Sequence, residues 1–188
     1  DGSSFTEVIM LPAEYFAFFK KLEKNNNMEW FNLHKKEFEQ QVKAPFHLLV
    51  EELLHLIRGI EPQLVMTPKD AVFRIYRDVR FSKDKRPYKT HMAAHISLYG
   101  KKAIGQPGFY FEASAEGGSL GGGCYQPDKE SLTLIRDLIM HEGKELHKLL
   151  RAAPFKTRFQ ELQGEKNKIL PAEFREAAEK EPLLYNKQ

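Results

Sequence analysis

The sequence predicts an α+β fold in which one mainly antiparallel sheet packs against helices. Apolar residues recur at helical spacing over residues 11–58, and helical spacing returns over residues 128–180. Between these regions, from about residue 70 to residue 125, apolar and polar residues alternate at the period of a half-buried strand. Helices, then strands, then helices are typical of an α+β arrangement. Because no linker interrupts this order, we expect a single domain over residues 1–188.

The first third of the chain is predicted to be helical. One helix face is indicated by apolar residues three or four apart, Leu11, Tyr15, Phe18, Phe19 and Leu22. Pro12 suits the first position of this helix, since its missing N–H has no partner there anyway. Asn27 is a good cap for a second helix that contains Trp30, and Pro45 breaks or restarts the helix before the apolar positions continue to Ile57. Trp30 is expected to lie in the core.

Four strands are expected in the middle of the chain. The first begins at Phe73 and ends near Phe81, and the second is centred on Ala94 to Leu98. The third covers residues 109–115 and the fourth residues 119–125, joined by a turn at Glu116-Gly117-Gly118. From Asp128, a predicted helix cap, the helical pattern resumes, and residues 171–180 form the last predicted helix.

The most unusual feature of the sequence is residues 73–91, which we call the basic segment. It contains two acids, Asp78 and Asp84, and seven cations: Arg74, Arg77, Arg80, Lys83, Lys85, Arg86 and Lys89. The segment is therefore +5, whereas the whole chain is +3. Nucleic-acid-binding proteins usually spread positive charge over a whole face. Positive charge concentrated in one strand and one loop instead favours a compact anionic target.

The basic segment therefore predicts a binding site for phosphate, a nucleotide or a carboxylate. If its two strands are antiparallel neighbours, the face with Arg74, Tyr76 and Asp78 adjoins the face with His91 and His95. The candidate ligand-binding residues are Arg74, Tyr76, Arg77, Arg80, Lys83, Lys85, Arg86, Tyr88 and Lys89. If the site is catalytic, the candidate acids and bases are Asp78, His91, His95 and Glu112.

Other interpretations of the basic segment stay open. Arg74 with Asp78, or Arg77 with a carboxylate of a helix, would simply fix the strand register as ion pairs. A nucleic-acid-binding module would continue the loop into a broad positive stripe. An interaction protein would dock a flat, exposed loop on an acidic partner. The sequence names neither a substrate, nor a reaction, nor an oligomeric state.

Several classes of site find no support in the sequence. On a strand, His91 and His95 would lie about 13 Å apart, too far to share one metal ion. The glycines at residues 121–123 precede no Gly-Lys-Ser/Thr, and no hydrolase elbow surrounds Ser119. We therefore expect no metal and no cofactor. The sequence has a single cysteine, Cys124, and no apolar run near the roughly 20 residues that span a bilayer. Residues 1–10 show no leader pattern. These features predict a cytoplasmic protein without a membrane partner.

The run from Arg74 to His91 closely resembles the signature of a widespread family known as domain of unknown function 2461. Similar features elsewhere are Trp30-Phe31, Lys43-Ala44-Pro45-Phe46, Pro107-Gly108-Phe109-Tyr110, Gly121-Gly122-Gly123 and Ile135-Arg136. The resemblance covers most of the chain. It implies an α+β fold, and it brings no established activity and no catalytic residues.

Overall fold

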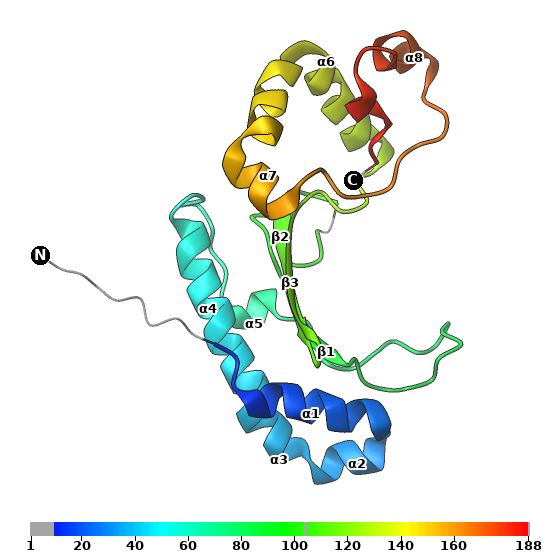
Figure 1. The fold of residues 1–188 in the computed structure, drawn as a ribbon. Helices are drawn as coiled ribbons and strands as arrows, with labels where there is room; N and C mark the ends of the chain where they lie inside the picture. The colour runs from blue at the N-terminus through cyan, green and yellow to red at the C-terminus, as the bar shows by residue number, and fades with distance from the viewer. Residues whose placement is uncertain (1–9, 104, 188) are drawn as a thin grey trace, which may run out of the picture. The chain divides into compact units, whose positions relative to one another are not determined.

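The structure is a computed structural model that describes residues 10–103 and 105–187 (Figure 1). The chain divides into two compact units. The sheet unit comprises Asp1–Ala103 and Pro107–Gly122, and the helical unit comprises Ile104–Gln106 and Gly123–Gln188. Each unit is described by itself, so the single-domain organisation stays a prediction. The first nine residues, part of the stretch in which we expect no leader, lie outside the described residues.

The helices of the sheet unit follow the predicted order. They are α1 (Ala13–Lys24), α2 (Met28–Leu33), α3 (Lys35–Glu37), the π-helical turn η1 (Phe38–Lys43), α4 (Ala44–Arg58) and the short α5 (Pro68–Ala71). Pro12 is the N-cap of α1, one position before the predicted place. The predicted cap of α2 is confirmed, because the Asn27 side chain accepts a hydrogen bond from the Trp30 amide at 2.9 Å. Pro45 lies in the first turn of α4, directly after the π-helical turn η1, so the helical backbone continues past it.

Aromatic side chains form the core of the sheet unit. Tyr15, Phe18 and Phe19 of α1 are fully buried, and the ring of Phe46 from α4 stacks on Phe111 of the sheet at 5.6 Å. The Tyr15 hydroxyl donates a buried hydrogen bond of 2.8 Å to the carbonyl of Ala113. Burial raises the pKa of this phenol well above its usual value, so the hydroxyl keeps the proton that it donates. Helix α1 is thereby tied to the sheet by a polar contact as well as by packing.

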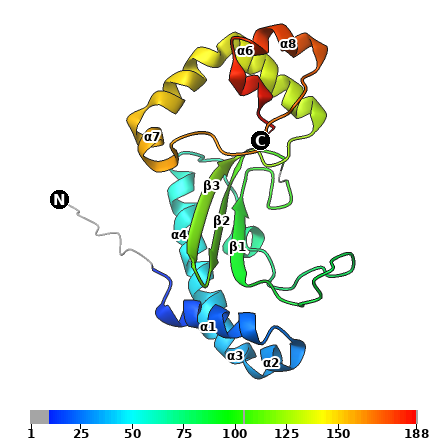
Figure 2. The same cartoon turned by 45° about the vertical axis from the view of Figure 1, so that its right-hand side comes forward.

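The sheet has three strands in the order β1–β2–β3, namely β1 (His91–Ile96), β2 (Gly108–Ser114) and β3 (Gly117–Gly123) (Figure 2). Strands β1 and β2 are antiparallel, with His91 opposite Ser114 and His95 opposite Tyr110. Side chains alternate between two faces. Met92, Ala94 and Ile96 belong to the core, and α4 lies behind the strands on that side. His91, Ala93, His95, Tyr110, Glu112 and Ser114 therefore lie on the opposite face.

The α+β prediction is confirmed for the mixture of helices and an antiparallel sheet, but the prediction of four strands is wrong. The segment from Phe73 to Phe81 forms only isolated bridges, Val72 with Ala94 and Tyr76 with Tyr88. The two bridges are four residues apart on one side, from Val72 to Tyr76, and six residues apart on the other, from Tyr88 to Ala94. A continuous ladder of strand pairs needs equal spacings on the two sides. The basic segment consequently runs beside β1 without becoming a strand, and residues 77–87 project as a loop (Figure 1).

Two glycines show how closely the sheet is packed. A Cβ atom on Gly108 would lie 2.6 Å from Nε2 of His95, so the imidazole occupies the space of a side chain there. A Cβ on Gly122 would meet the ring of Phe109 at 3.4 Å. Gly122 therefore lies on the core face of β3. At this position of the glycine-rich strand, a phenylalanine ring lies close to the backbone.

The helical unit contains α6 (Lys129–Arg151), α7 (Ala153–Phe159), α8 (Ala172–Ala178) and the 3₁₀ turn η2 (Pro182–Tyr185). The predicted cap of α6 is confirmed, since the Asp128 carboxylate accepts from the Ser131 amide at 2.7 Å. Phe174 and Leu184 are fully buried, and the Nε atom of the buried Arg136 donates to the carbonyl of Leu184 at 2.9 Å. This bond attaches η2 to α6. None of the helices within the described residues has the length and apolarity needed to cross a membrane.

Candidate functional site

The basic segment is attached to the helices through Tyr88. The Asn26 side chain donates to the Tyr88 carbonyl at 3.0 Å and accepts from the Tyr88 amide at 3.1 Å, as a neighbouring strand would do. The Tyr88 ring is buried and stacks on Phe31 at 3.9 Å. Burial raises the pKa of the Tyr88 phenol, with a smaller contribution from Tyr76. Tyr88, a predicted ligand-binding residue, is thus a core anchor that fixes the start of β1.

The loop is braced by Asp84, which serves two arginines. Its Oδ2 atom lies 2.7 Å from Nη1 of Arg77 and 2.7 Å from Nη2 of Arg86, and Arg77 also donates to the carbonyl of Arg86 at 3.2 Å. These hydrogen bonds, first those from Arg86, hold the pKa of Asp84 far below its usual range. The carboxylate is therefore charged at any ordinary pH, and it neutralises part of the charge of both guanidinium groups.

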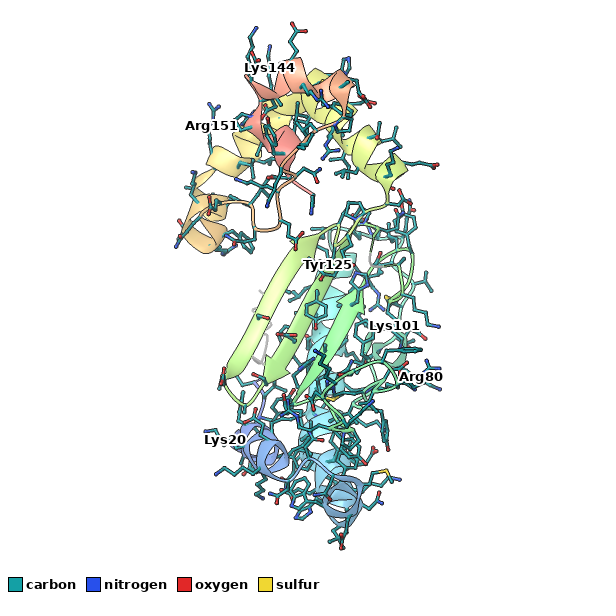
Figure 3. All side chains as sticks on the ribbon, turned by 90° about the vertical axis from the view of Figure 1, so that its right-hand side faces the viewer. Lys20, Arg80, Lys101, Tyr125, Lys144 and Arg151 are labelled. Carbon is teal, nitrogen blue, oxygen red and sulfur yellow. The ribbon has the colours of Figure 1, made fainter. Side chains whose placement is uncertain are left out.

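Arg80 is matched by Asp78 in a second, local pair. Its Nε and Nη2 atoms donate to the two carboxylate oxygens at 2.9 and 2.7 Å, a bidentate arrangement. The hydrogen bonds from Arg80 lower the pKa of Asp78. Asp78 therefore pairs with Arg80 and not with Arg74. Figure 3 shows Arg80 on the loop beside the sheet. Both groups are well exposed, so the pair contributes little to stability.

Three further predicted residues lie on the outside of the loop or at its base. Lys83 is exposed, and Lys85 donates from Nζ to the carbonyl of Val79 at 3.0 Å. Tyr76 is about half exposed, with its ring 5.3 Å from that of Tyr88. Both lysines add to the local positive field, and their exposure limits what each can contribute to binding.

Arg74 and Lys89 differ from the other cations of the basic segment. No ion pair formed within the described residues includes either of them. Arg74 is exposed, whereas Lys89 is partly buried with its ammonium 5.3 Å from the centre of the Phe73 ring. Burial lowers the pKa of Lys89, and the charge of Arg74 lowers it further. Two neighbouring cations without an acid thus lie where the segment meets β1.

His91 and Glu112, two of the candidate acids and bases, are brought together on the same side of the sheet. Nε2 of His91 lies 4.0 Å from Oε2 of Glu112, and the Tyr110 hydroxyl donates to that oxygen at 2.7 Å. Burial is the main reason why the pKa of His91 is lowered; Glu112 opposes the shift and Lys89 adds to it. The imidazole is therefore neutral at neutral pH and can accept a proton. Burial and Glu112 raise the pKa of Tyr110, so its hydroxyl stays protonated.

His95 lies on the same face of β1 but is enclosed. Only 6% of the residue is exposed, Nδ1 is 3.1 Å from the carbonyl of Lys101, and Nε2 lies against Gly108. Figure 3 places Lys101 beside β1 on the loop-bearing side of the sheet. The structure therefore separates the two candidate histidines. His91 is partly exposed, whereas His95 is buried against the backbone of Lys101 and Gly108.

Sequence reasoning missed three contributors to this arrangement. Phe73 was treated as a strand residue, although its ring faces the Lys89 ammonium. Tyr110 was not a candidate, yet it holds Glu112; the alternation that puts both on one face was a usable signal. Asn26 was treated only as part of a helix end, and no local pattern connects it to Tyr88, which lies 62 residues later.

Each unit has a groove on its surface. One of about 530 Å³ is lined by η1, α4 and α5, and includes His47, whose pKa is lowered mainly by burial. Another of about 640 Å³ follows α6 past Lys144 and Arg151, both labelled in Figure 3. No predicted site residue lines either groove. Within the residues described, no group of three or more His, Cys, Asp or Glu side chains is arranged to hold a metal ion.

Comparison with known proteins gives a family without a named activity. No curated protein and no solved structure matches the chain. A family model described as "Conserved hypothetical protein (DUF2461)" matches residues 14–188, which is nearly the whole sequence and includes both units. The chain therefore belongs to the DUF2461 family of conserved hypothetical proteins.

Proposed function

We propose that the sheet unit binds a small anion, such as phosphate or a phosphate ester, against Arg74, Lys89 and His91. The observation that carries the proposal is the contrast among the arginines of the basic segment. Arg77, Arg80 and Arg86 each have a carboxylate at 2.7 Å, whereas Arg74 and its neighbour Lys89 have none within the described residues. A bound anion would supply the charge that the fold does not provide there.

The expected affinity is modest. Hydrogen bonds to charged groups contribute about 1.5–3 kcal/mol each. Two or three of them correspond to dissociation constants from about millimolar to micromolar. Arg74 is exposed and loses freedom when it binds, so the weaker end of this range is expected for inorganic phosphate. A phosphate ester would bind more tightly through contacts of its organic part.

The paired arginines then have a supporting role in this proposal. The contacts of Arg77 and Arg86 with Asp84 fix the loop, and the loop holds the positions of Arg74 and Lys89. His91, with Glu112 and Tyr110 behind it, lies next to the anion as a group that can exchange a proton. An enzymatic role is compatible with this set of side chains. A cytoplasmic location stays a prediction that rests on the sequence.

Titration of the protein with phosphate, followed by NMR of backbone amides, tests the proposal. We expect saturable shifts at residues 73–75, 88–92 and 112, and loss of this binding in Arg74→Gln. Lys83→Gln is the matched control, because it removes the same charge from an exposed residue of the same segment. Equal losses in the two variants would show that only the general positive field attracts the anion.

The competing functions predict other outcomes of the same titration. A nucleic-acid-binding module would bind an oligonucleotide far more tightly than phosphate, with an affinity that falls steeply as salt increases. A module that docks an acidic protein would show shifts across residues 77–87 instead of at Arg74. Absence of saturable shifts up to molar phosphate would contradict the proposed site.

A further inference from the structure

The groove on α6 in the helical unit is lined mainly by cationic side chains. Its volume is about 640 Å³, and the residues that line it are Lys144, His147, Lys148, Arg151 and Ala152. The two lysines and the arginine are exposed, and all three belong to α6, on which Figure 3 labels Lys144 and Arg151. No acidic residue is among the lining residues. The lining of this groove is therefore positively charged.

The three cations of the groove form a row along one side of the helix. Lys144, Lys148 and Arg151 are separated by four and by three residues. Residues at these spacings are neighbours on the surface of an α-helix. With a rise of about 1.5 Å per residue, the row from Lys144 to Arg151 is about 10 Å long. A row of this length can contact two phosphate groups of one ligand at the same time.

The acids of this region neutralise little of the charge of the row. From residue 143 to residue 159 the sequence has five lysines and arginines and one acid, Glu145. Glu145 lies 3.6 Å from Nζ of Lys148, but both side chains are well exposed, so the contact is weak. Neither Lys144 nor Arg151 forms an ion pair with any residue that the structure describes. The helix dipole favours cations in the last turn, where Lys148 and Arg151 lie, but Lys144 precedes that turn.

His147 adds a polar group whose position is fixed. Its Nε2 atom lies 2.6 Å from Oε2 of Glu181, and the other carboxylate oxygen of Glu181 accepts a hydrogen bond from the Leu183 amide at 3.2 Å. Leu183 belongs to η2, so these contacts join the imidazole on α6 to that turn. Glu181 itself does not line the groove. Its carboxylate is held by His147 and η2, which leaves the lysines of the groove available to a ligand.

We infer that this groove binds small molecules that carry two or more phosphate groups. Lysine and arginine form charge-assisted hydrogen bonds with phosphate oxygens, and an arginine can donate two of them to one phosphate. Sites for small molecules have volumes of about 300–1,000 Å³, a range that includes this groove. A nucleic acid would instead contact positive charge spread over a whole face. The inference does not depend on the proposed anion site, which belongs to the sheet unit.

Titration of the full chain with fructose 1,6-bisphosphate and with fructose 6-phosphate, followed by NMR of backbone amides, tests the inference. We expect saturable shifts at residues 144–152, with the bisphosphate bound about tenfold more tightly than the monophosphate. Arg151→Gln should weaken this binding by about tenfold, the loss expected for one charged hydrogen bond. Lys156→Gln is the matched control, because Lys156 is an exposed cation of the same unit that does not line the groove.

Three results would overturn the inference. Equal affinities for the two sugar phosphates would show that a second phosphate group finds no partner in the groove. Equal losses in Arg151→Gln and Lys156→Gln would show that only the general positive field attracts the ligand. Tighter binding of an oligonucleotide, with an affinity that falls steeply as salt increases, would assign the groove to nucleic acid. The proposed anion site is scored separately, by shifts at residues 73–75 and 88–92 and by Arg74→Gln, so either site can fail alone.

Discussion

Nη1 of Arg77 lies 2.7 Å from Oδ2 of Asp84, a contact that closes the basic loop across seven residues. Both groups are only partly exposed, unlike Arg80 in its pair with Asp78. The contact lies next to the hydrogen bond from the Arg77 amide to the carbonyl of Pro87. The two interactions together hold the base of the loop in one conformation.

We expect Asp84→Asn to loosen the loop, with faster hydrogen exchange at the Arg77 amide and a small decrease in melting temperature. Asp78→Asn is the control, since it removes a carboxylate of a more exposed pair and should leave that amide protected. Because the pKa of Asp84 is lowered on folding, the stabilisation is present above the unfolded pKa near 4 and is lost as the pH falls below it. Equal exchange in both variants would contradict the bracing role of Asp84.

Asn26→Ala should destabilise the sheet unit by about 1–3 kcal/mol, because it removes both hydrogen bonds that pair Asn26 with the Tyr88 backbone. Chemical denaturation measures the free energy of unfolding. Asn25→Ala serves as the comparison, since the Asn25 side chain makes one exposed bond, to the carbonyl of Lys21. If Asn26→Ala lowers the free energy of unfolding no more than Asn25→Ala does, Asn26 does not anchor Tyr88.

Gly108→Ala should destabilise the sheet by about 1–3 kcal/mol through overpacking, as a Cβ there would lie 2.6 Å from the His95 ring and 2.9 Å from the carbonyl of Ile96. Gly121→Ala is a matched control on β3, because no atom lies within 4 Å of its added Cβ. The double variant Gly108→Ala with His95→Ala should recover part of the loss. Denaturation curves that coincide for the two glycine variants would disprove the close approach of His95.

The affinity of the site for sulfate should rise as the pH falls below about 6.5, the unperturbed pKa of histidine. Folding lowers the pKa of His91 mainly through burial, so the free protein holds the ring neutral at pH 7. A bound dianion favours the imidazolium, and binding therefore takes up a proton. Sulfate does not titrate between pH 5 and 8. The difference in sulfate affinity between the wild type and His91→Gln, measured by calorimetry over this range, therefore reports on the protonation of His91. A pH dependence that persists in the variant would assign it to another group.

Local patterns predicted much of the fold. The caps at Asn27 and Asp128 depend only on residues three positions away, and both are confirmed. The alternation in residues 109–115 likewise predicted β2 nearly to its ends. The expected strand that begins at Phe73 is absent, because the bridge of Val72 to Ala94 in β1 and the bridge of Tyr76 to Tyr88 are out of register by two residues. The number of residues that separates two bridges cannot be read from the periodicity of either segment alone.

The candidate site was predictable as a region and not as a set of contacts. The charge of the basic segment indicated where to look. The contact between His91 and Glu112 depends on the register of β1 and β2, which the period of either strand does not give. The sequence did not decide which cations the fold neutralises. That depends on Asp84, whose one carboxylate serves Arg77 and Arg86 only because the loop folds back on itself.

The bridges at Val72 and Tyr76 enclose unequal lengths of chain on the two sides, and this difference has a structural consequence. The longer side carries two extra residues, and it includes Lys89 and His91 of the proposed anion site. We expect that deleting two residues between Tyr88 and Ala94 would make the two spacings equal and convert residues 72–76 into a regular fourth strand. Lys89, His91 and Arg74 would then lie at regular ladder positions, and we expect the proposed binding of phosphate to weaken.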